Sequence, residues 1–211
     1  MVSIVRPSDS AVSRNSFTRP YQRFFKRTLD LALVTATLPI TLPIIGAISL
    51  AICVESKGPA FLRVTRKGRG EKRFRQYRFR CVHVDATDRL STLGKSVDFA
   101  SDPRLTMIGR FLLRTRLNTL PQLLNVLMGH MSLVGPQAEL MRNVEANPSL
   151  GAPTEHTTPG IICASSLPVY AELTDSERNA IAIAYGQNVS LGVDCRVMLH
   201  ALKQLISADR A

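Results

Sequence analysis

The residues best suited to chemistry are basic, and most of them lie between positions 57 and 80. Ten Lys and Arg residues occur there against a single acid, Glu71. Basic and apolar residues alternate from Phe61 to Phe79, which predicts a short hairpin or extended run. Cations at this density bind phosphate groups, lipid headgroups or a nucleic acid backbone. Gly68-Arg69-Gly70 does not by itself indicate a phosphate loop, because glycines between arginines are common in turns.

The whole chain is basic and long enough to fold. Its 211 residues carry 27 Lys and Arg against 16 Asp and Glu, a net charge of +11, and 45% of them are hydrophobic. This composition excludes a disordered chain and predicts one domain, or one domain with an accessory element. The charge predicts a polyanionic partner: nucleic acid, an anionic membrane face or phosphorylated substrates. The cysteines form no CxxC pair, which argues against structural zinc and a disulfide scaffold and fits a reducing compartment. They are Cys53, Cys81, Cys163 and Cys195.

A membrane segment is predicted from Leu31 to Val54, because 24 residues pass without one charge and about 20 apolar residues cross a bilayer. Pro39 and Pro43 fall inside this segment and predict a kink. Basic residues crowd both flanks, and Lys and Arg mark the cytoplasmic side of a membrane. A re-entrant helix that enters, breaks at the prolines and returns to the same face satisfies both ends. A kinked span through the membrane remains the alternative.

The segment before it, 17–30, has aromatic residues at helical spacing with Arg and Lys between them. This pattern predicts an amphipathic helix in the headgroup layer, and the alternative is a helix packed on the protein's own core. Residues 1–16 form a short polar segment, and we expect a mobile tail. Thr174 and Glu177 have the spacing of a capping box. A helical core stripe is predicted at Val193, Val197, Ala201, Leu202 and Leu205.

Motifs in one fixed order cover the chain from Lys26 to Leu205. The most specific block runs from Leu120-Pro121-Gln122-Leu123 to Met131-Ser132-Leu133-Val134-Gly135-Pro136. In this order and with few gaps, the sequence resembles the bacterial sugar transferases, also called monotopic phosphoglycosyl transferases, and is similar to exopolysaccharide-initiating members. The other motifs are Lys26-Arg27…Asp30, Ser56-Lys57-Gly58-Pro59, Arg78-Phe79-Arg80, Asp102-Pro103-Arg104-Leu105-Thr106, Gly109-Arg110-Phe111-Leu112, Pro159-Gly160-Ile161 and Tyr185…Asn188…Asp194.

The resemblance implies a reaction and a location. Such enzymes transfer a hexose-1-phosphate from a UDP-sugar to a polyprenyl phosphate such as undecaprenyl phosphate and release UMP, at the cytoplasmic face of the bacterial inner membrane. An adjacent Asp-Glu pair and Mg²⁺ carry the chemistry. The Asp carboxylate attacks the diphosphate and forms a covalent sugar-phosphate intermediate. The resemblance also implies phosphate-binding positions at Arg78, Arg80, Arg104, Arg110 and Gln137.

The catalytic pair is missing at the positions that the resemblance assigns to it. The block Leu-Asp-Glu-Leu-Pro-Gln reads Leu117-Asn118-Thr119-Leu120-Pro121-Gln122 here. Asn118 is neutral, a weak nucleophile and a poor Mg²⁺ ligand, and Thr119 removes the second negative charge. The sequence therefore predicts an impaired or inactive transferase, with no catalytic residue and no metal ligand assigned. Further departures are Gln137 in place of an arginine, Leu113, and Ile162-Cys163.

We expect an α-rich α+β fold on the cytoplasmic membrane face, with a re-entrant helix-break-helix, interfacial amphipathic helices and a short basic β-hairpin. The expected organisation is a tail at 1–16, an interfacial helix at 17–30, a re-entrant helix at 31–54 and a cytoplasmic sugar-transferase domain at 55–211. Expected partners are polyprenyl phosphate, a UDP-sugar and an active relative of the family, but not nucleic acid. Two alternatives stay open: a membrane-bound non-catalytic binder or regulator of an active transferase, and a basic nucleic-acid-binding protein, against which the apolar segment argues.

Overall fold

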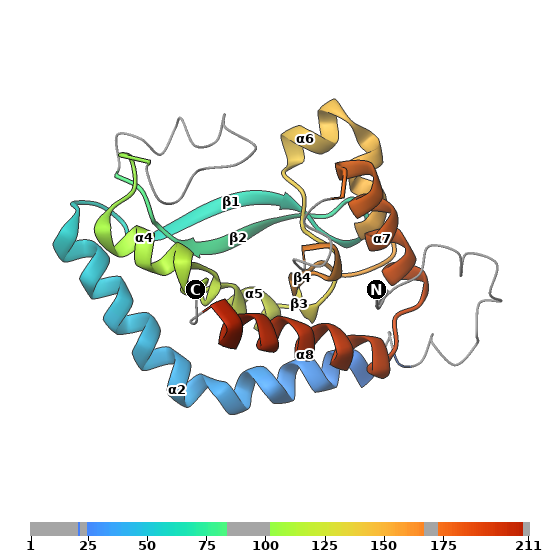
Figure 1. Ribbon diagram of the computed structural model, residues 1–211, viewed down its shortest axis with the longest axis horizontal. Helices are drawn as coiled ribbons and strands as arrows, with labels where there is room; N and C mark the ends of the chain where they lie inside the picture. The colour runs from blue at the N-terminus through green and yellow to red at the C-terminus, as the bar shows by residue number, and fades with distance from the viewer. Residues whose placement is uncertain (1–20, 22–24, 84–101, 167–172, 209–211) are drawn as a thin grey trace. The chain divides into compact units, whose positions relative to one another are not determined.

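The computed structural model describes residues 21, 25–83, 102–166 and 173–208. The predicted tail at 1–16 and much of the predicted interfacial helix at 17–30 lie outside these residues. The fold is a helix-rich α+β fold, in agreement with the sequence. Its helices are α2 (Lys26–Glu55), α4 (Met107–Arg114), α5 (Gln122–Leu127), α6 (Met141–Ala146), α7 (Asp175–Gln187) and α8 (Leu191–Ala208), and its strands are β1 (Phe61–Lys67), β2 (Arg73–Phe79), β3 (Ser132–Val134) and β4 (Gly160–Ile162) (Figure 1).

The chain forms two compact units that share several elements. Unit 1 contains Met1–Val34, Thr65–Arg75 and Asn125–Ala211, and unit 2 contains Thr35–Val64 and Gln76–Leu124. Helices α2 and α5 and strands β1 and β2 therefore contribute residues to both units.

Helix α2 is one continuous helix of 30 residues, with Pro39 and Pro43 inside it. The backbone break that we expected at these prolines is absent, because each proline removes one hydrogen bond and the others continue the helix. The Thr41 hydroxyl donates to the Thr37 carbonyl at 3.0 Å, and the Ser49 hydroxyl donates to the Ile45 carbonyl at 2.7 Å. The hydroxyl groups of Thr41 and Ser49 thus find partners within the helix itself, as a lipid environment requires.

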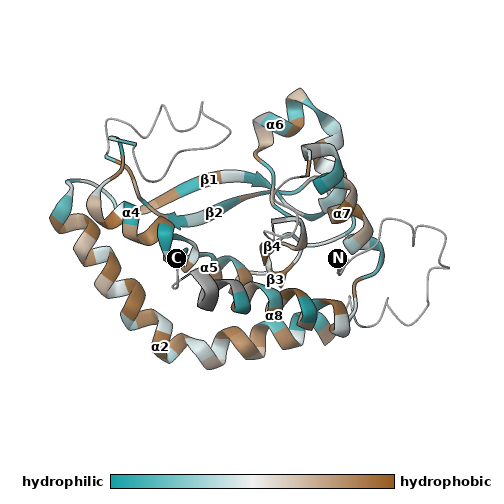
Figure 2. Ribbon diagram, viewed as in Figure 1, coloured by the Kyte–Doolittle hydropathy of each residue, from teal (hydrophilic) through white to brown (hydrophobic). Residues whose placement is uncertain are grey.

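The surface of α2 is consistent with a membrane and not with a soluble core. Hydrophobic residues dominate the helix along its length (Figure 2). Its most apolar 18-residue window is only 11% buried, whereas a core helix of a soluble protein would be mostly covered. Ile40 and Leu50 are each 68% exposed. Exposed apolar patches of this size mark contact with lipid or with another protein.

Unit 2 contains α2 from Thr35 onward and the open end of the β1–β2 hairpin, whereas the turn of the hairpin belongs to unit 1. The hairpin predicted between Phe61 and Phe79 is confirmed, and these two rings stack with their centroids 5.5 Å apart. The hydrophobic core of unit 2 packs α2 and the β1–β2 hairpin against α4. The buried members of this core are Ile45, Ile52, Ala60, Phe79 and Leu112.

A glycine lets α4 approach the chain that follows the hairpin. A Cβ atom on Gly109 would lie 2.0 Å from the Cys81 carbonyl oxygen, which no side chain can occupy. The Thr106 hydroxyl caps the helix by accepting a hydrogen bond from the Gly109 N–H at 2.9 Å, and the Thr106 N–H donates to the same Cys81 carbonyl at 3.1 Å. The Gly109 motif therefore fixes the position of α4 within unit 2.

Unit 1 contains a short parallel pair, β3 and β4, whose register joins Ser132 to Gly160 and Val134 to Ile162. Two backbone segments, at Gly135 and at 158–160, pack closely against each other beside this strand pair. A Cβ on Gly160 would lie 2.1 Å from the Gly135 nitrogen, and one on Gly135 would lie 2.5 Å from the Thr158 carbonyl oxygen. Two glycines of the sequence motifs are thus explained by close backbone packing.

Helices α7 and α8 complete the core of unit 1. Val134 lies in the buried cluster of this unit together with Tyr185 and Val197. The predicted capping box is confirmed at Thr174 and Glu177. In the predicted stripe of α8, Val193 and Ala201 also pack on the cluster, but Leu202 is 54% exposed and that part of the prediction is wrong. Leu202 lies one residue beyond the i, i+4, i+8 row and so turns away from the core.

Candidate functional site

The position of the expected catalytic pair is a single 3₁₀ turn, Leu117–Thr119, in unit 2. The turn begins after Arg116, whose φ of 58° is a left-handed conformation that is unusual for a side-chain-bearing residue. The Thr119 hydroxyl donates to the Arg116 carbonyl at 2.9 Å. The half-buried Asn118 side chain has no hydrogen-bond partner among the described residues. The turn thus presents one neutral amide and one hydroxyl that is already engaged.

A second amide lies one helical turn beyond Asn118, at Gln122. Gln122 is 2% exposed, and its side-chain nitrogen is buried without a hydrogen-bond partner within the described residues. A buried donor of this kind carries a cost of about 1–3 kcal/mol unless a ligand or water satisfies it. The sequence reasoning did not select Gln122 as a site residue, although its spacing of four residues from Asn118 was the available signal.

Two of the predicted phosphate-binding arginines lie near Asp102 at the start of α4. The Arg104 guanidinium donates from Nε to Asp102 Oδ1 at 2.8 Å, and its Nη2 also binds this carboxylate. Hydrogen bonds from Arg104 lower the pKa of Asp102 to about 2, and the charge of Arg110 contributes to the same shift. Asp102 is therefore ionised and held by Arg104. Arg110 acts on Asp102 through its charge, but it makes no side-chain hydrogen bond in the described part of the chain.

Arg80 holds the chain after α2. Its guanidinium donates to the carbonyls of Ser56 and Lys57 at 2.7 and 3.1 Å, and only 3% of the residue is exposed. These carbonyls follow the C-terminal end of the helix, where a cation is favourable. Both of these contacts are to backbone, so the structure assigns Arg80 a positioning task, and a phosphate-binding role stays a prediction.

Arg78 and Gln137 complete the predicted set. Arg78 is half-buried on β2, and its charge acts on the Cys81 thiol. Burial raises the pKa of Cys81 to about 12, so this thiol is protonated and is not a nucleophile. Gln137 is exposed and belongs to unit 1, whereas the other predicted site residues belong to unit 2. The structure thus groups Arg104 with Arg110 and assigns Gln137 to the other unit.

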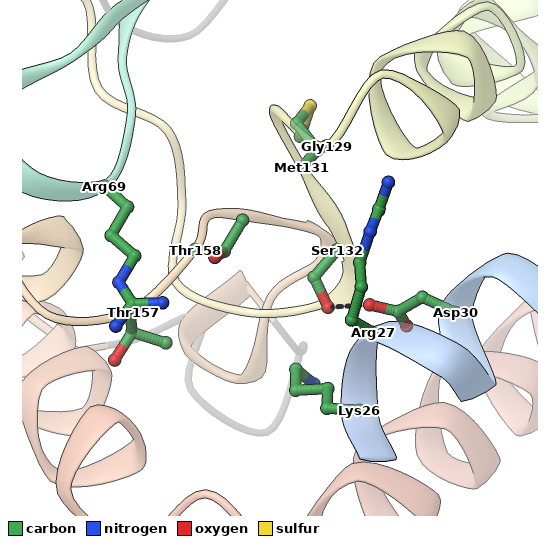
Figure 3. Close-up of a pocket in the computed structure, with 9 residues that line it drawn as sticks. All are labelled: Lys26, Arg27, Asp30, Arg69, Gly129, Met131, Ser132, Thr157 and Thr158. Atoms are coloured by element: carbon green, nitrogen blue, oxygen red, sulfur yellow. Dashed lines mark hydrogen bonds between the residues drawn. The ribbon is translucent and has the colours of Figure 1, made fainter. Parts of the chain in front are cut away.

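A small pocket of about 50 Å³ opens in unit 1, at the start of α2. In Figure 3 the Asp30 carboxylate faces the Ser132 hydroxyl, which donates to it at 2.6 Å, and Arg27 extends toward Gly129. Arg27 donates to the carbonyls of Val126 and Leu127. These charged groups from α2 are therefore bound within the protein. The lining residues are Lys26, Arg27, Asp30, Arg69, Gly129, Met131, Ser132, Thr157 and Thr158.

Lys26 takes part in a buried ion pair that joins α2 to α8. Its ammonium lies 2.5 Å from the Asp194 carboxylate, and the two side chains are 7% and 5% exposed. The Tyr21 and Tyr185 hydroxyls donate to the same carboxylate at 2.9 and 2.6 Å. Burial raises the pKa of Tyr185, so its hydroxyl stays protonated and can donate. The motifs Lys26-Arg27…Asp30 and Tyr185…Asp194 thus meet in one structural network.

The sequence profile of the family described as "Bacterial sugar transferase" matches residues 21–208. The chain is 40% identical over 112 residues to the exopolysaccharide production protein PSS of Rhizobium leguminosarum bv. phaseoli, a match that covers 53% of the chain and 54% of that protein. It is 38% identical over 123 residues to a UDP-glucose:undecaprenyl-phosphate glucose-1-phosphate transferase of Escherichia coli (strain K12), which covers 58% of the chain and 26% of that protein.

A longer match is found in Caulobacter vibrioides. The chain is 32% identical over 204 residues to a UDP-glucose:undecaprenyl-phosphate glucose-1-phosphate transferase of that organism, and the match covers 88% of the chain and 71% of the relative. For the Rhizobium and Escherichia proteins, by contrast, the chain spans about half and about a quarter of the relative's length.

Proposed function

Because this chain belongs to the bacterial sugar transferase family, we propose that it is a membrane-bound relative of the undecaprenyl-phosphate sugar-1-phosphate transferases whose own transfer step is lost or severely impaired. The proposal extends the substrates named for the relatives, a UDP-sugar and undecaprenyl phosphate, to this chain as ligands. The observation that carries the impairment is the pair Asn118 and Thr119 at the position where the family resemblance implies Asp and Glu.

The turn Leu117–Thr119 contains no activated nucleophile. The amide oxygen of Asn118 is neutral and therefore a much weaker nucleophile than a carboxylate oxygen. The Thr119 hydroxyl donates its hydrogen bond to the Arg116 carbonyl instead of to a base. Asp102 is the carboxylate of the neighbouring motif, but Arg104 binds both of its oxygens. Covalent attack on a diphosphate therefore has no suitable group among these residues.

The residues of the turn do not fit a magnesium ion. Mg²⁺ is held in phosphoryl-transfer sites by one or two carboxylates together with substrate oxygens, and Asn118 and Thr119 offer neutral oxygens only. Within the described residues, no group of three or more His, Cys, Asp or Glu side chains comes together. We therefore propose no step through a metal ion in this protein.

We expect the protein to bind a UDP-sugar even though its transfer step is lost. The Arg110 guanidinium is not held by a side chain in the described ranges, and each charge-assisted contact to a phosphate contributes about 1.5–3 kcal/mol when desolvated. We expect weak binding of UDP-glucose that falls as salt increases, with no UMP release above background in the presence of lipid phosphate.

The Asp102→Asn variant frees Arg104 and should bind UDP-glucose severalfold more tightly. Calorimetry in detergent measures both proteins, and absence of any saturable heat in either would contradict retained binding.

We further propose that α2 is re-entrant, with both ends on the cytoplasmic face. The support is electrostatic, because Lys26 and Arg27 precede the apolar stretch and the basic hairpin follows it. Pro39 and Pro43 weaken the helix in its middle, where a bend would let it return. A bend without loss of helical structure suits the continuous α2.

Cysteine labelling tests this topology. In a protein whose four native cysteines are replaced by serine, single cysteines are introduced at Ser16 and at Lys57. A membrane-impermeant thiol reagent added to spheroplasts should label neither position, and both should react once the membrane is permeabilised. Labelling of only one of them from outside would establish a span through the membrane instead.

A second candidate function is regulation of an active relative by a non-catalytic copy of the scaffold. One observation favours it. The glycines of the family motifs that allow close backbone packing, Gly109, Gly135 and Gly160, are present, whereas the catalytic pair is replaced. Addition of this protein to an active transferase in the same vesicles should change UMP release by the active enzyme if the regulator function is correct. An unchanged rate at excess protein would exclude it.

A further inference from the structure

The turn of the β1–β2 hairpin carries a motif that the proposed function does not use, Gly68-Arg69-Gly70. Gly70 has a φ of 60°, a left-handed conformation that favours glycine. Its N–H donates to the Glu155 carbonyl at 3.1 Å, and the Gly68 N–H donates to the Lys72 carbonyl at 2.7 Å. The turn is therefore closed on itself and held against the loop that contains Glu155, which fixes the backbone from which the Arg69 side chain extends.

Arg69 lines the pocket at the start of α2, and every lining residue of this pocket belongs to unit 1. In Figure 3 the Arg69 side chain extends from the hairpin on the side of the pocket where Thr157 lies. The Arg69 side chain has no hydrogen-bond or ion-pair partner in the described part of the chain, and the same is true of the half-buried Thr158 hydroxyl. The pocket therefore offers a cation and a hydroxyl that are both unused.

The other charged residues of the pocket form a fixed floor. Lys26 is paired with the buried Asp194 carboxylate, and the Asp30 carboxylate accepts a hydrogen bond from the Ser132 hydroxyl at 2.6 Å. Arg27 donates to two backbone carbonyls of α5, which leaves part of its set of five N–H donors available. Because Lys26 is neutralised by its partner, Arg27 and Arg69 together outweigh the charge of Asp30, and the pocket favours an anion.

The size of the pocket limits what it can enclose. Its volume is about 50 Å³, whereas pockets that enclose a drug-sized ligand have roughly 300–1,000 Å³, so a whole nucleotide sugar does not fit inside it. One water molecule needs about 10–15 Å³ of such a volume, and the pocket therefore holds a group with a few oxygen atoms. A phosphate group has this size, and the planar fork of arginine matches its oxygens.

We propose that this pocket binds a phosphate group, either as inorganic phosphate or as the end of a phosphate monoester. Arg69 is the principal donor to the phosphate oxygens, the Thr158 hydroxyl is a second donor, and Arg27 contributes charge. Gly129 fits this arrangement, since a Cβ atom there would lie 3.5 Å from Nη2 of Arg27 and would crowd the guanidinium. The site shares no residue with the UDP-sugar contacts of the proposed function and does not rest on them.

Calorimetric titration of the full chain in detergent with inorganic phosphate, at constant ionic strength, tests the site. The unmodified protein should show saturable binding. Arg69→Gln should weaken it by roughly tenfold or more, because a charge-assisted contact is lost, and Thr158→Val, which keeps the shape of the side chain, should weaken it severalfold. The matched control is Arg75→Gln, which removes the same charge from an exposed position of the same hairpin outside the pocket and should change the affinity less than about twofold.

Two further probes identify the source of the phosphate. UMP and dihexanoyl phosphatidic acid, the latter below its critical micelle concentration, carry the same phosphate monoester on a nucleoside and on a lipid. The probe that binds more tightly than inorganic phosphate, and that loses this affinity in Arg69→Gln, identifies the natural ligand as a nucleotide or as a lipid phosphate. If neither gains affinity, inorganic phosphate itself is the ligand.

Three results would overturn the proposal: no saturable binding of phosphate, equal losses in Arg69→Gln and Arg75→Gln, or a loss in Arg110→Gln that Arg69→Gln does not share. The Tm of Arg69→Gln should stay within about 2 °C of the unmodified protein, because the side chain is exposed and has no partner among the described residues. Arg69→Gln should also bind UDP-glucose as the unmodified protein does. Phosphate binding that depends on Arg69 in a protein that does not bind UDP-glucose would contradict the proposed function and leave this site standing.

Discussion

Restoring both carboxylates, by Asn118→Asp together with Thr119→Glu, should raise UMP release from a UDP-hexose by about three powers of ten over the unmodified protein. Loss of a nucleophile costs several powers of ten, and each factor of ten corresponds to about 1.4 kcal/mol of activation free energy. The 3₁₀ turn Leu117–Thr119 that carries both residues lies within the range matched by the family profile, so the introduced side chains would occupy a formed turn. The measurement is UMP release in vesicles that contain undecaprenyl phosphate, with Mg²⁺ present.

Matched variants separate the charge from the mutation itself. Asn118→Asp alone should restore less than the pair, because residues that act as a unit have non-additive effects. Asn118→Gln together with Thr119→Gln changes both side chains without adding charge and should give no increase. Gln137→Arg, added to the restored pair, should increase the rate further. A restored pair that binds UDP-glucose but releases UMP no faster than the neutral double variant would contradict the assignment of these positions.

Replacing Lys26 by Met should destabilise the protein by about 3–5 kcal/mol, because it leaves the Asp194 charge buried without its cation. The Asp194 side chain is 5% exposed, and two tyrosine hydroxyls can compensate for only part of the loss. For a chain of this size the expected drop in Tm is on the order of 10 °C. Thermal unfolding in detergent measures the change.

Two controls test whether burial is the reason. Arg73→Met breaks an ion pair with Glu145 whose side chains are 66% and 59% exposed, and it should cost less than about 1 kcal/mol. The double variant Lys26→Met with Asp194→Asn should be more stable than the sum of the two single changes predicts, because neither charge is then left alone. Equal losses of Tm in Lys26→Met and Arg73→Met would contradict a structural ion pair between α2 and α8.

Local patterns in the sequence predicted the elements that depend on neighbouring residues. Alternation between Phe61 and Phe79 predicted the hairpin, because side chains in a strand alternate between faces. The spacing of Thr174 and Glu177 predicted the start of α7, where the Thr174 N–H donates to the Glu177 carboxylate at 2.8 Å. The uncharged stretch of α2 predicted an apolar helix, and its exposed surface agrees with contact to a membrane.

Contacts between distant residues could not be read from the same patterns. Lys26 and Asp194 are 168 positions apart, and each stood in a recognised motif without any sign that the two motifs meet. Arg80 looked like one more cation of a basic stretch, yet its guanidinium binds the carbonyls of Ser56 and Lys57. Sequence shows which residues carry charge, whereas the fold decides which of those charges are already satisfied.

The prolines of α2 show a second limit. Pro39 and Pro43 predicted a break, and each does remove a backbone donor, but α2 stays helical across both. The effect of a proline depends on whether the remaining backbone hydrogen bonds hold the helix, and those on either side of Pro39 and Pro43 do so here. The buried side-chain nitrogen of Gln122, which has no hydrogen-bond partner among the described residues, could not be predicted either, since burial is a property of packing and not of residue type.

Intact-protein mass spectrometry shows whether this chain can form a covalent sugar-phosphate intermediate at all. The unmodified protein and the double variant Asn118→Asp, Thr119→Glu are incubated with UDP-glucose and Mg²⁺ in the absence of a lipid acceptor. In the variant, the carboxylate introduced at position 118 attacks the phosphorus that bears the sugar, which releases UMP and leaves glucose phosphate on the protein. We expect this adduct in the variant and an unchanged mass in the unmodified protein. A glucose-phosphate adduct on the unmodified protein would contradict the claim that replacing the catalytic pair removed its chemistry.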